Sequence, residues 1–348
     1  MRSSTPTTCP DRGALIVSAP ILAPVLTDPS AVKIPPTVQA ALAAFGIPAD
    51  THAISLYAHA PVYRSRAGSQ TVARNGQDCV IKRSGMVHSD APAIDRWLHH
   101  LQARGVATVA AAPGFAPNPR PMPDGHHWVI YPFIEGRSYD GSDADIEAAG
   151  FLLGHIHVAG AFNDWGLKAY FRPPHRDPAW IDRHAASACA AMRAHGVDDA
   201  PFRRRLMQNR RDAEPPGGLP MAGGSVDYKA SNLVFAPHPV LIDPDHAAFL
   251  PRIYDLAIAA LLFHDDLPPA PGRPWTSAEW SSFLTGYARL IRLEAAERAA
   301  WPEMLRLAWL DQAVWLLGNC ATGWAEPRQR AFLNTLAGLD LTAFALLA

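Results

Sequence analysis

The change in hydrophobic pattern near residue 134 constrains the fold more than any other feature of this sequence. Before it, short apolar runs separated by turn signals predict strands. After it, apolar residues recur at helical spacing, beginning with Asp143–His157, and only residues 215–245 interrupt the helical pattern. The sequence therefore predicts an α+β protein with a small β-rich lobe followed by a larger, mostly helical lobe. The strand candidates are Val62–Arg66, Cys79–Lys82, Trp128–Ile134, Leu233–Phe235 and Val240–Ile242.

The length agrees with this division, because 348 residues exceed the ~250–300 at which a single hydrophobic core stops growing. Residues 1–37 are rich in Pro, Ser and Thr and are predicted to be a disordered leader. We expect residues 38–134 to form the N-terminal lobe and residues 135–348 the C-terminal lobe. Within the first lobe, Ala91–Arg104 is predicted to be a helix, because Ile94, Trp97, Leu98 and Leu101 share one face.

Composition excludes several classes of function. The 31 basic and 32 acidic residues nearly balance, so we expect neither a nucleic acid partner nor an anionic membrane surface. No apolar run approaches the ~20 residues that span a bilayer. The four cysteines are far apart in the sequence, which favours a reducing, cytoplasmic location over a disulfide framework or a zinc site. The sequence leaves the oligomeric state open.

Lysine is scarce in this chain and occurs only at Lys33, Lys82, Lys168 and Lys229. A compact ammonium group differs from the planar guanidinium of arginine. Where most basic residues are arginine, the presence of a lysine therefore favours a function that requires an ammonium group. Lys82 and Lys229 both fall within motifs that point to chemistry.

The segment from Ser225 to Asp245 carries the most specific motif. Asp227, Lys229 and Asn232 form D-x-K-x-x-N, and Asp243 follows eleven residues after Asn232. Phosphoryl transfer needs a carboxylate to orient the attacking hydroxyl, and a cation to offset charge. It also needs carboxylate and amide oxygens to hold metal ions. Each of these side chains could instead be an ordinary turn residue, but together they favour the catalytic interpretation.

The segment resembles the catalytic loop and metal site of the aminoglycoside phosphotransferase and choline kinase-like family, which has a protein-kinase-like fold. The resemblance implies that Asp227 is the catalytic base and that Asn232 and Asp243 are the metal ligands. It places Lys229 against the γ-phosphate. The implied cofactors are ATP and Mg²⁺, and the implied partner is a small-molecule acceptor with a hydroxyl group.

Further segments resemble the family in the expected order. Lys82 corresponds to the strand lysine that holds the α- and β-phosphates, and Asp95 is the nearest candidate for the acid of the first helix. The segment Trp128–Gly136 resembles the hinge whose backbone binds adenine. Its nucleotide-binding candidates are Tyr131, Phe133 and Ile134. By analogy with aminoglycoside kinases, Asp265, Asp266 and Asp311 are candidates for binding a cationic acceptor.

Three departures keep a second hypothesis open. Ser225 and Val226 stand where the family has His and Gly, Asp95 is shorter than the usual glutamate, and the loop Tyr57–Tyr63 has no glycine. A catalytically degenerate nucleotide-binding or regulatory module would show such losses, although it would not need both Asn232 and Asp243. A kinase that acts on proteins is disfavoured, because the stretch from Asp245 to Tyr254 is too short to form an activation segment.

Overall fold

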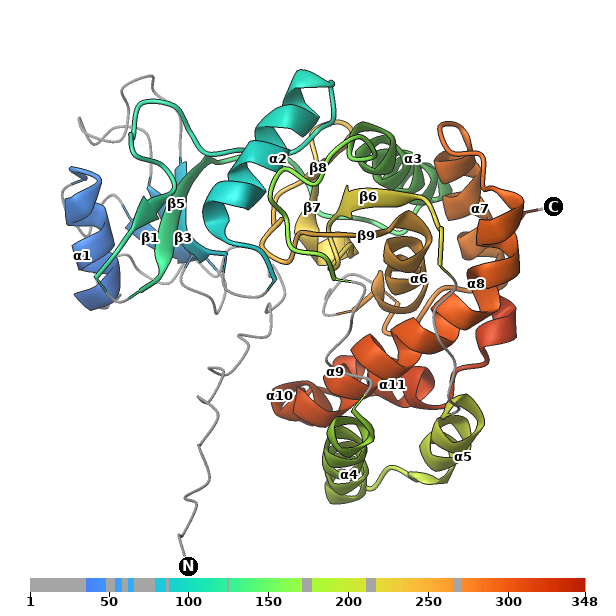
Figure 1. Cartoon of the computed structure of the whole chain (residues 1–348). Helices are drawn as coiled ribbons and strands as arrows, with labels where there is room; N and C mark the ends of the chain where they lie inside the picture. Colours follow the sequence, from blue (N-terminus) through green and yellow to red (C-terminus); the bar gives the residue numbers. More distant parts are fainter. Residues whose placement is uncertain are drawn as a thin grey trace, which may run out of the picture.

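In the described part of the first lobe, five strands form an antiparallel sheet in the order β1-β2-β3-β5-β4. Figure 1 labels β1, β3 and β5 of this sheet beside helix α1. The computed structural model describes residues 36–47, 54–57, 62–65, 79–85, 88–123, 125–170, 177–210, 217–265 and 271–347. The predicted leader therefore lies outside the described residues up to residue 35, as does most of the glycine-free loop. The strands are β1 (Ile54–Tyr57), β2 (Val62–Ser65), β3 (Cys79–Ser84), β4 (Arg120–Pro121) and β5 (His127–Pro132).

The two faces of this sheet have different partners because side chains alternate along each strand. One face of β3 and β5 packs under helix α1 (Pro36–Ala44). The other face carries Lys82 and Ser84 on β3, with Val129 and Tyr131 on the paired strand β5. The predicted leader, residues 1–37, overlaps α1 by two residues, since Pro36 and Thr37 belong to that helix. Proline suits the first helical turn. The apolar side chains under α1 are Cys79, Ile81, Trp128 and Ile130.

Helix α2 (Ala91–Ala103) connects the sheet to the helical region. Asp90 caps it by accepting a hydrogen bond from Ala93 N at 2.8 Å. Its predicted apolar stripe is confirmed, since Ile94, Trp97, Leu98 and Leu101 are all fully buried. They join the hydrophobic core of the second lobe, and Figure 1 shows α2 between the sheet and that lobe.

The second lobe is mostly helical, as the sequence predicts. Helix α6 is buried along nearly its whole length and forms the centre of the core. Helices α3 and α7 approach closely at Gly150 and Gly286, where an added Cβ would lie 1.9 Å from a backbone oxygen of the other helix. The helices are α3 (Asp143–Ala159), α4 (Pro178–Ala194), α5 (Ala200–Asn209), α6 (Arg252–Leu262), α7 (Ser277–Ala288), α8 (Ala295–Ala308), α9 (Val314–Asn319), α10 (Ala321–Ala325) and α11 (Pro327–Ala337), with a π-turn, η4 (Trp309–Ala313), between α8 and α9 and a 3₁₀ turn, η5 (Leu341–Ala343), near the end.

Two short strand pairs position the loop between them. The expected hairpin is present as β7 (Leu233–Phe235) and β8 (Pro239–Leu241), which pair in antiparallel register. A second pair, β6 (Met221–Gly224) with β9 (Ala248–Pro251), was not predicted from the sequence. The loop from Ser225 to the 3₁₀ turn η3 (Ala230–Asn232) runs from β6 to β7. Among the described helices, none combines the length and apolar character needed to cross a membrane.

Candidate active site

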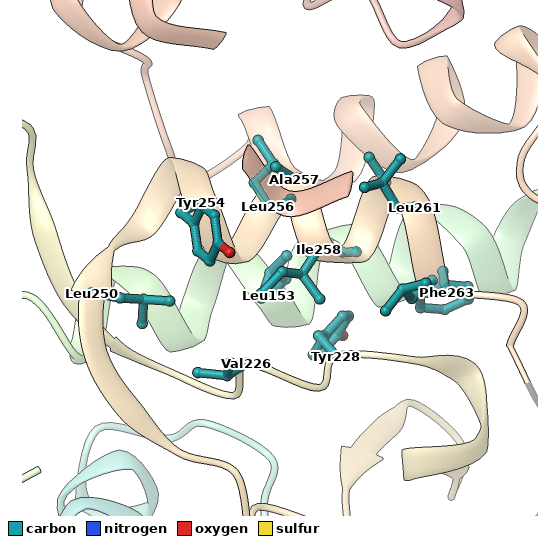
Figure 2. Close-up of a cluster of buried hydrophobic side chains, with 14 of the residues drawn as sticks. Leu153, Val226, Tyr228, Leu250, Tyr254, Leu256, Ala257, Ile258, Leu261 and Phe263 are labelled. Carbon is teal, nitrogen blue, oxygen red and sulfur yellow. The ribbon is translucent and has the colours of Figure 1, made fainter. Parts of the chain in front are cut away.

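The loop that carries the D-x-K-x-x-N motif is anchored through alternate residues. Val226 and Tyr228 are buried against helices α6 and α3 in the cluster drawn in Figure 2. The Tyr228 hydroxyl also donates a hydrogen bond to Ala149 O of α3 at 2.7 Å. The residues that alternate with them are Asp227 and Lys229, whose charged groups lie 3.4 Å apart. The apolar half of the loop thus fixes the position of its charged half.

A buried aspartate stabilises the start of this loop. The backbone amides of Ser225 and Val226 donate to the Asp255 carboxylate at 3.0 and 2.8 Å. His157 Nε2 lies 3.1 Å from the same carboxylate. The Ser225 backbone, not its side chain, therefore connects the loop to the core at the position where the related family has histidine. Val226 has a φ of +59°, a conformation that strains a β-branched residue and explains the family's glycine there.

Hydrogen bonds and ion pairs join the three motif residues in one group. Asn232 Nδ2 donates to Asp227 Oδ2 at 2.9 Å and to Asp227 O at 2.8 Å. Lys229 Nζ lies between Asp227 Oδ1 at 3.4 Å and Asp265 Oδ2 at 3.7 Å. Gln329 Nε2 holds the other oxygen of Asp265 at 2.6 Å. Burial raises the pKa of Asp265, although Lys229 and Gln329 act in the opposite direction.

The hairpin brings Asp243 to this group and connects it to the N-terminal sheet. Ile242 N donates to Asn232 O at 3.0 Å, which places Asp243 beside the loop. Asp243 Oδ1 lies 2.7 Å from Lys82 Nζ, so residues 161 positions apart in the sequence meet. Burial alone would raise the pKa of Asp243, but its pairing with Lys82 outweighs burial and lowers it.

Lys82 has a second acidic partner that the sequence did not suggest. Asp245 Oδ2 lies 2.8 Å from Lys82 Nζ, and Ser84 Oγ donates to Asp245 Oδ1 at 2.6 Å. Burial by itself lowers the pKa of an ammonium group, yet the two carboxylates raise the pKa of Lys82 above its ordinary value. Two signals could have indicated this contact: Asp245 follows Asp243 by two residues, and Ser84 shares the strand face of Lys82.

Asp95 does not take the place expected for a helix acid beside Lys82. Its carboxylate accepts a hydrogen bond from Ala111 N at 3.0 Å and lies 3.5 Å from His99 Nε2. Both contacts hold Asp95 within its own lobe, while the ion pairs of Lys82 are with Asp243 and Asp245. A position on the first predicted helix was therefore not sufficient to identify the partner of Lys82.

The remaining candidates that the structure describes lie at the junction of the lobes or inside the second lobe. Tyr131 is buried in β5, and Phe133 and Ile134 follow it, half-buried, where the chain enters the second lobe. Asp265 and Asp311 are only 3% and 5% exposed, and both are engaged by protein groups. The Asp311 carboxylate accepts hydrogen bonds from the hydroxyls of Tyr170 and Tyr254, whereas Asp266 lies outside the described residues.

This geometry brings together Asp227, Lys229, Asn232, Asp243 and Lys82 from two lobes. Residues 62–314 match the model of the phosphotransferase enzyme family. The chain belongs to that family. It is thus a small-molecule kinase, as the sequence predicted, and the family resemblance drawn from its motifs is confirmed.

Solved structures with the same protein-kinase-like fold support the architecture of the phosphotransferase. An amicoumacin kinase in complex with AMP-PNP and Ca²⁺ is 15% identical, with a TM-score of 0.55 over 82% of this chain and 87% of the other. A microcompartment-associated aminopropanol kinase is 17% identical, with a TM-score of 0.55 over 89% and 98% of the two chains. An AMP-bound spectinomycin phosphotransferase is 13% identical, with a TM-score of 0.52 over 80% and 91%. No curated protein matches the sequence.

Proposed function

We propose that this phosphotransferase transfers the γ-phosphate of ATP to a hydroxyl group of a small molecule with the assistance of Mg²⁺. The observation that carries the proposal is the continuous set of contacts from Asp227 through Asn232 and the hairpin to Asp243 and Lys82. These residues supply a base, metal-binding oxygens and cations, which are the parts that phosphoryl transfer requires.

Asp227 has the role of orienting the acceptor hydroxyl and taking its proton. The Asn232 amide fixes one of its carboxylate oxygens, and the Lys229 ammonium lies near the other. The loop anchors at Val226 and Tyr228 keep this carboxylate in position. A general base held in this way contributes about 10²–10⁴-fold to the rate. Lys229 stabilises the negative charge on the transferring group.

Asn232 and Asp243 fit a magnesium ion. Because Asn232 Nδ2 makes both hydrogen bonds to Asp227, its Oδ1 is the atom available as a ligand. Asp243 uses Oδ1 for Lys82, and its side chain remains 31% exposed. Among the described residues, no three His, Cys, Asp or Glu side chains form a metal cage. Magnesium in nucleotide sites needs only one or two carboxylates besides phosphate oxygens. When bound, the ion neutralises phosphate charge.

The nucleotide would lie between the two lobes. Lys82 would hold its α- and β-phosphates, and the backbone near Tyr131, Phe133 and Ile134 would bind adenine. The structural neighbours include an amicoumacin kinase in complex with AMP-PNP and an AMP-bound spectinomycin phosphotransferase, which supports a nucleotide as the ligand. A cytoplasmic location, where Mg-ATP is abundant, completes the proposal.

The acceptor is a hydroxyl-bearing small molecule of the antibiotic, amino alcohol or sugar type. The neighbours act on chemically different acceptors, among them amicoumacin, aminopropanol and spectinomycin. Asp265 and Asp311 would act on the acceptor only indirectly, since both carboxylates already bind protein groups. Asp266 remains a candidate for direct contact with a cationic acceptor.

The nucleotide site can be tested by thermal unfolding with and without Mg-ATP, using the wild-type protein and Asp243→Ala. A ligand that binds only the folded state raises the melting temperature by mass action. We expect a magnesium-dependent increase in the wild type that the variant lacks. No increase at millimolar Mg-ATP would contradict the proposal and favour a degenerate site. An increase justifies a screen of hydroxylated acceptors for ADP release.

A further inference from the structure

The carboxylate of Asp245 is fixed at both of its oxygens by residues of strand β3. Oδ1 accepts the hydrogen bond from Ser84 Oγ at 2.6 Å, and Oδ2 lies 2.8 Å from Lys82 Nζ. Ser84 and Lys82 are two residues apart, so their side chains leave the same face of the strand. The side chains of Lys82 and Asp245 are 8% and 17% exposed, which makes this an ion pair with little access to solvent.

A buried ammonium group needs a permanent counterion, because an uncompensated buried charge is strongly destabilising. Asp95 cannot be that counterion, since its carboxylate is committed to Ala111 N and lies near His99. Asp243 contacts Lys82, but the proposed function assigns Asp243 to the metal ion. Asp245 is the carboxylate whose second oxygen is already satisfied by the strand itself.

We propose that Asp245, held by Ser84, is the positioning residue for Lys82 and takes the role expected of an acid on helix α2. This inference rests on the proposed function, in which Lys82 binds the phosphates of ATP. It assigns one member of the Asp243-Pro244-Asp245 segment to the metal and the other to the lysine. It also explains how the nucleotide site can work although Asp95 has a shorter side chain than the family's glutamate and makes no ion pair with Lys82.

The test is the affinity for Mg-AMP-PNP, measured by calorimetry on the single variants Asp245→Asn, Ser84→Ala and Lys82→Met. Asp245→Asn and Ser84→Ala are then each combined with Lys82→Met, and the affinity of the two double variants is measured in the same way. We expect Asp245→Asn to weaken binding about tenfold, the effect of losing one charged hydrogen-bond partner. Ser84→Ala leaves all charges in place and should weaken binding about threefold by loosening Asp245. In the Lys82→Met background, both effects should disappear, because a positioning residue acts only through the group it positions.

Asp95→Asn is the matched control, since it makes the same chemical change on α2 and keeps an oxygen for Ala111 N. It should leave the affinity unchanged, and a loss equal to that of Asp245→Asn would overturn the inference. Persistence of the Asp245→Asn effect in the Lys82→Met background would also overturn it, because that result would indicate a direct metal ligand. A loss of binding in Lys82→Met alone, with full binding in both Asp245→Asn and Ser84→Ala, would contradict this inference but not the proposed function. Unchanged binding in Lys82→Met would contradict both.

Discussion

The two lysines of the site are both buried beside two carboxylates, but at different distances from them. Lys82, on the N-terminal sheet, lies 2.7 and 2.8 Å from the carboxylates of Asp243 and Asp245. Lys229, on the loop of the second lobe, lies 3.4 and 3.7 Å from Asp227 and Asp265. Both lysines are almost completely buried, at 6% and 4% exposed. Similar burial is therefore compatible with different distances between an ammonium group and its carboxylates.

The two lysines differ in the geometry of these ion pairs. Contacts of 2.7–2.8 Å are charge-assisted hydrogen bonds, which fix a side chain in one geometry. The Lys229 ammonium lies farther from its two carboxylates, at 3.4 and 3.7 Å, where the attraction is mainly electrostatic. Under the proposed function, Lys82 acts on the bound nucleotide and Lys229 acts on the transferring phosphoryl group.

Acid should destabilise the protein through His264, which precedes Asp265 in the sequence. Burial lowers the pKa of His264 to about 4, and its ring nitrogens contact Tyr139 OH and Arg273 O. The unfolded chain binds a proton near pH 6.5, whereas the folded protein resists it until about pH 4. The contribution of His264 to stability is thus complete above pH 6.5 and is lost as the pH falls towards 4.

The expected size of this loss is about 3 kcal/mol. It can be measured by urea unfolding of the wild type and His264→Gln across that pH range, because glutamine keeps a hydrogen-bonding group without titrating. The stability of the wild type should fall by this amount more than that of the variant. Parallel pH curves for the two proteins would show that His264 does not carry the effect.

The second acidic partner of each lysine offers the most direct way to sharpen the comparison. In Asp265→Asn we expect turnover to fall about tenfold, because Lys229 loses one of its two carboxylates. Nucleotide affinity should stay near that of the wild type, in contrast to the result expected for Asp245→Asn. Steady-state kinetics together with nucleotide binding separates the two. A loss of affinity in Asp265→Asn with turnover preserved would remove the distinction between the lysines.

Local patterns were sufficient to predict much of this arrangement. The apolar stripe of α2, the hairpin after Asn232 and the strand that carries Lys82 follow from spacing and turn signals, which act over a few residues. The grouping of Asp227, Lys229 and Asn232 was equally accessible, because one short loop contains all three. Helix α1 escaped prediction because its few apolar residues follow a proline-rich stretch.

Contacts between residues far apart in the sequence could not be predicted in this way. Whether Lys82 pairs with Asp95 or Asp245 depends on how the sheet meets the hairpin, and the two aspartates have similar chemistry in the sequence. The acidic candidates Asp265 and Asp311 raised the same difficulty. Their carboxylates accept hydrogen bonds from Gln329 and from two tyrosines, which come from other parts of the lobe.

The central claim is that Asp227 is the base of a working phosphotransferase site. It is tested most directly by single-turnover phosphate transfer in the wild type and Asp227→Asn, with nucleotide affinity measured on the same preparations. If Asp227 is the base, transfer should slow by at least about a hundredfold in the variant, while the affinity for Mg-ATP remains close to that of the wild type. Transfer at an undiminished rate in Asp227→Asn would contradict the claim.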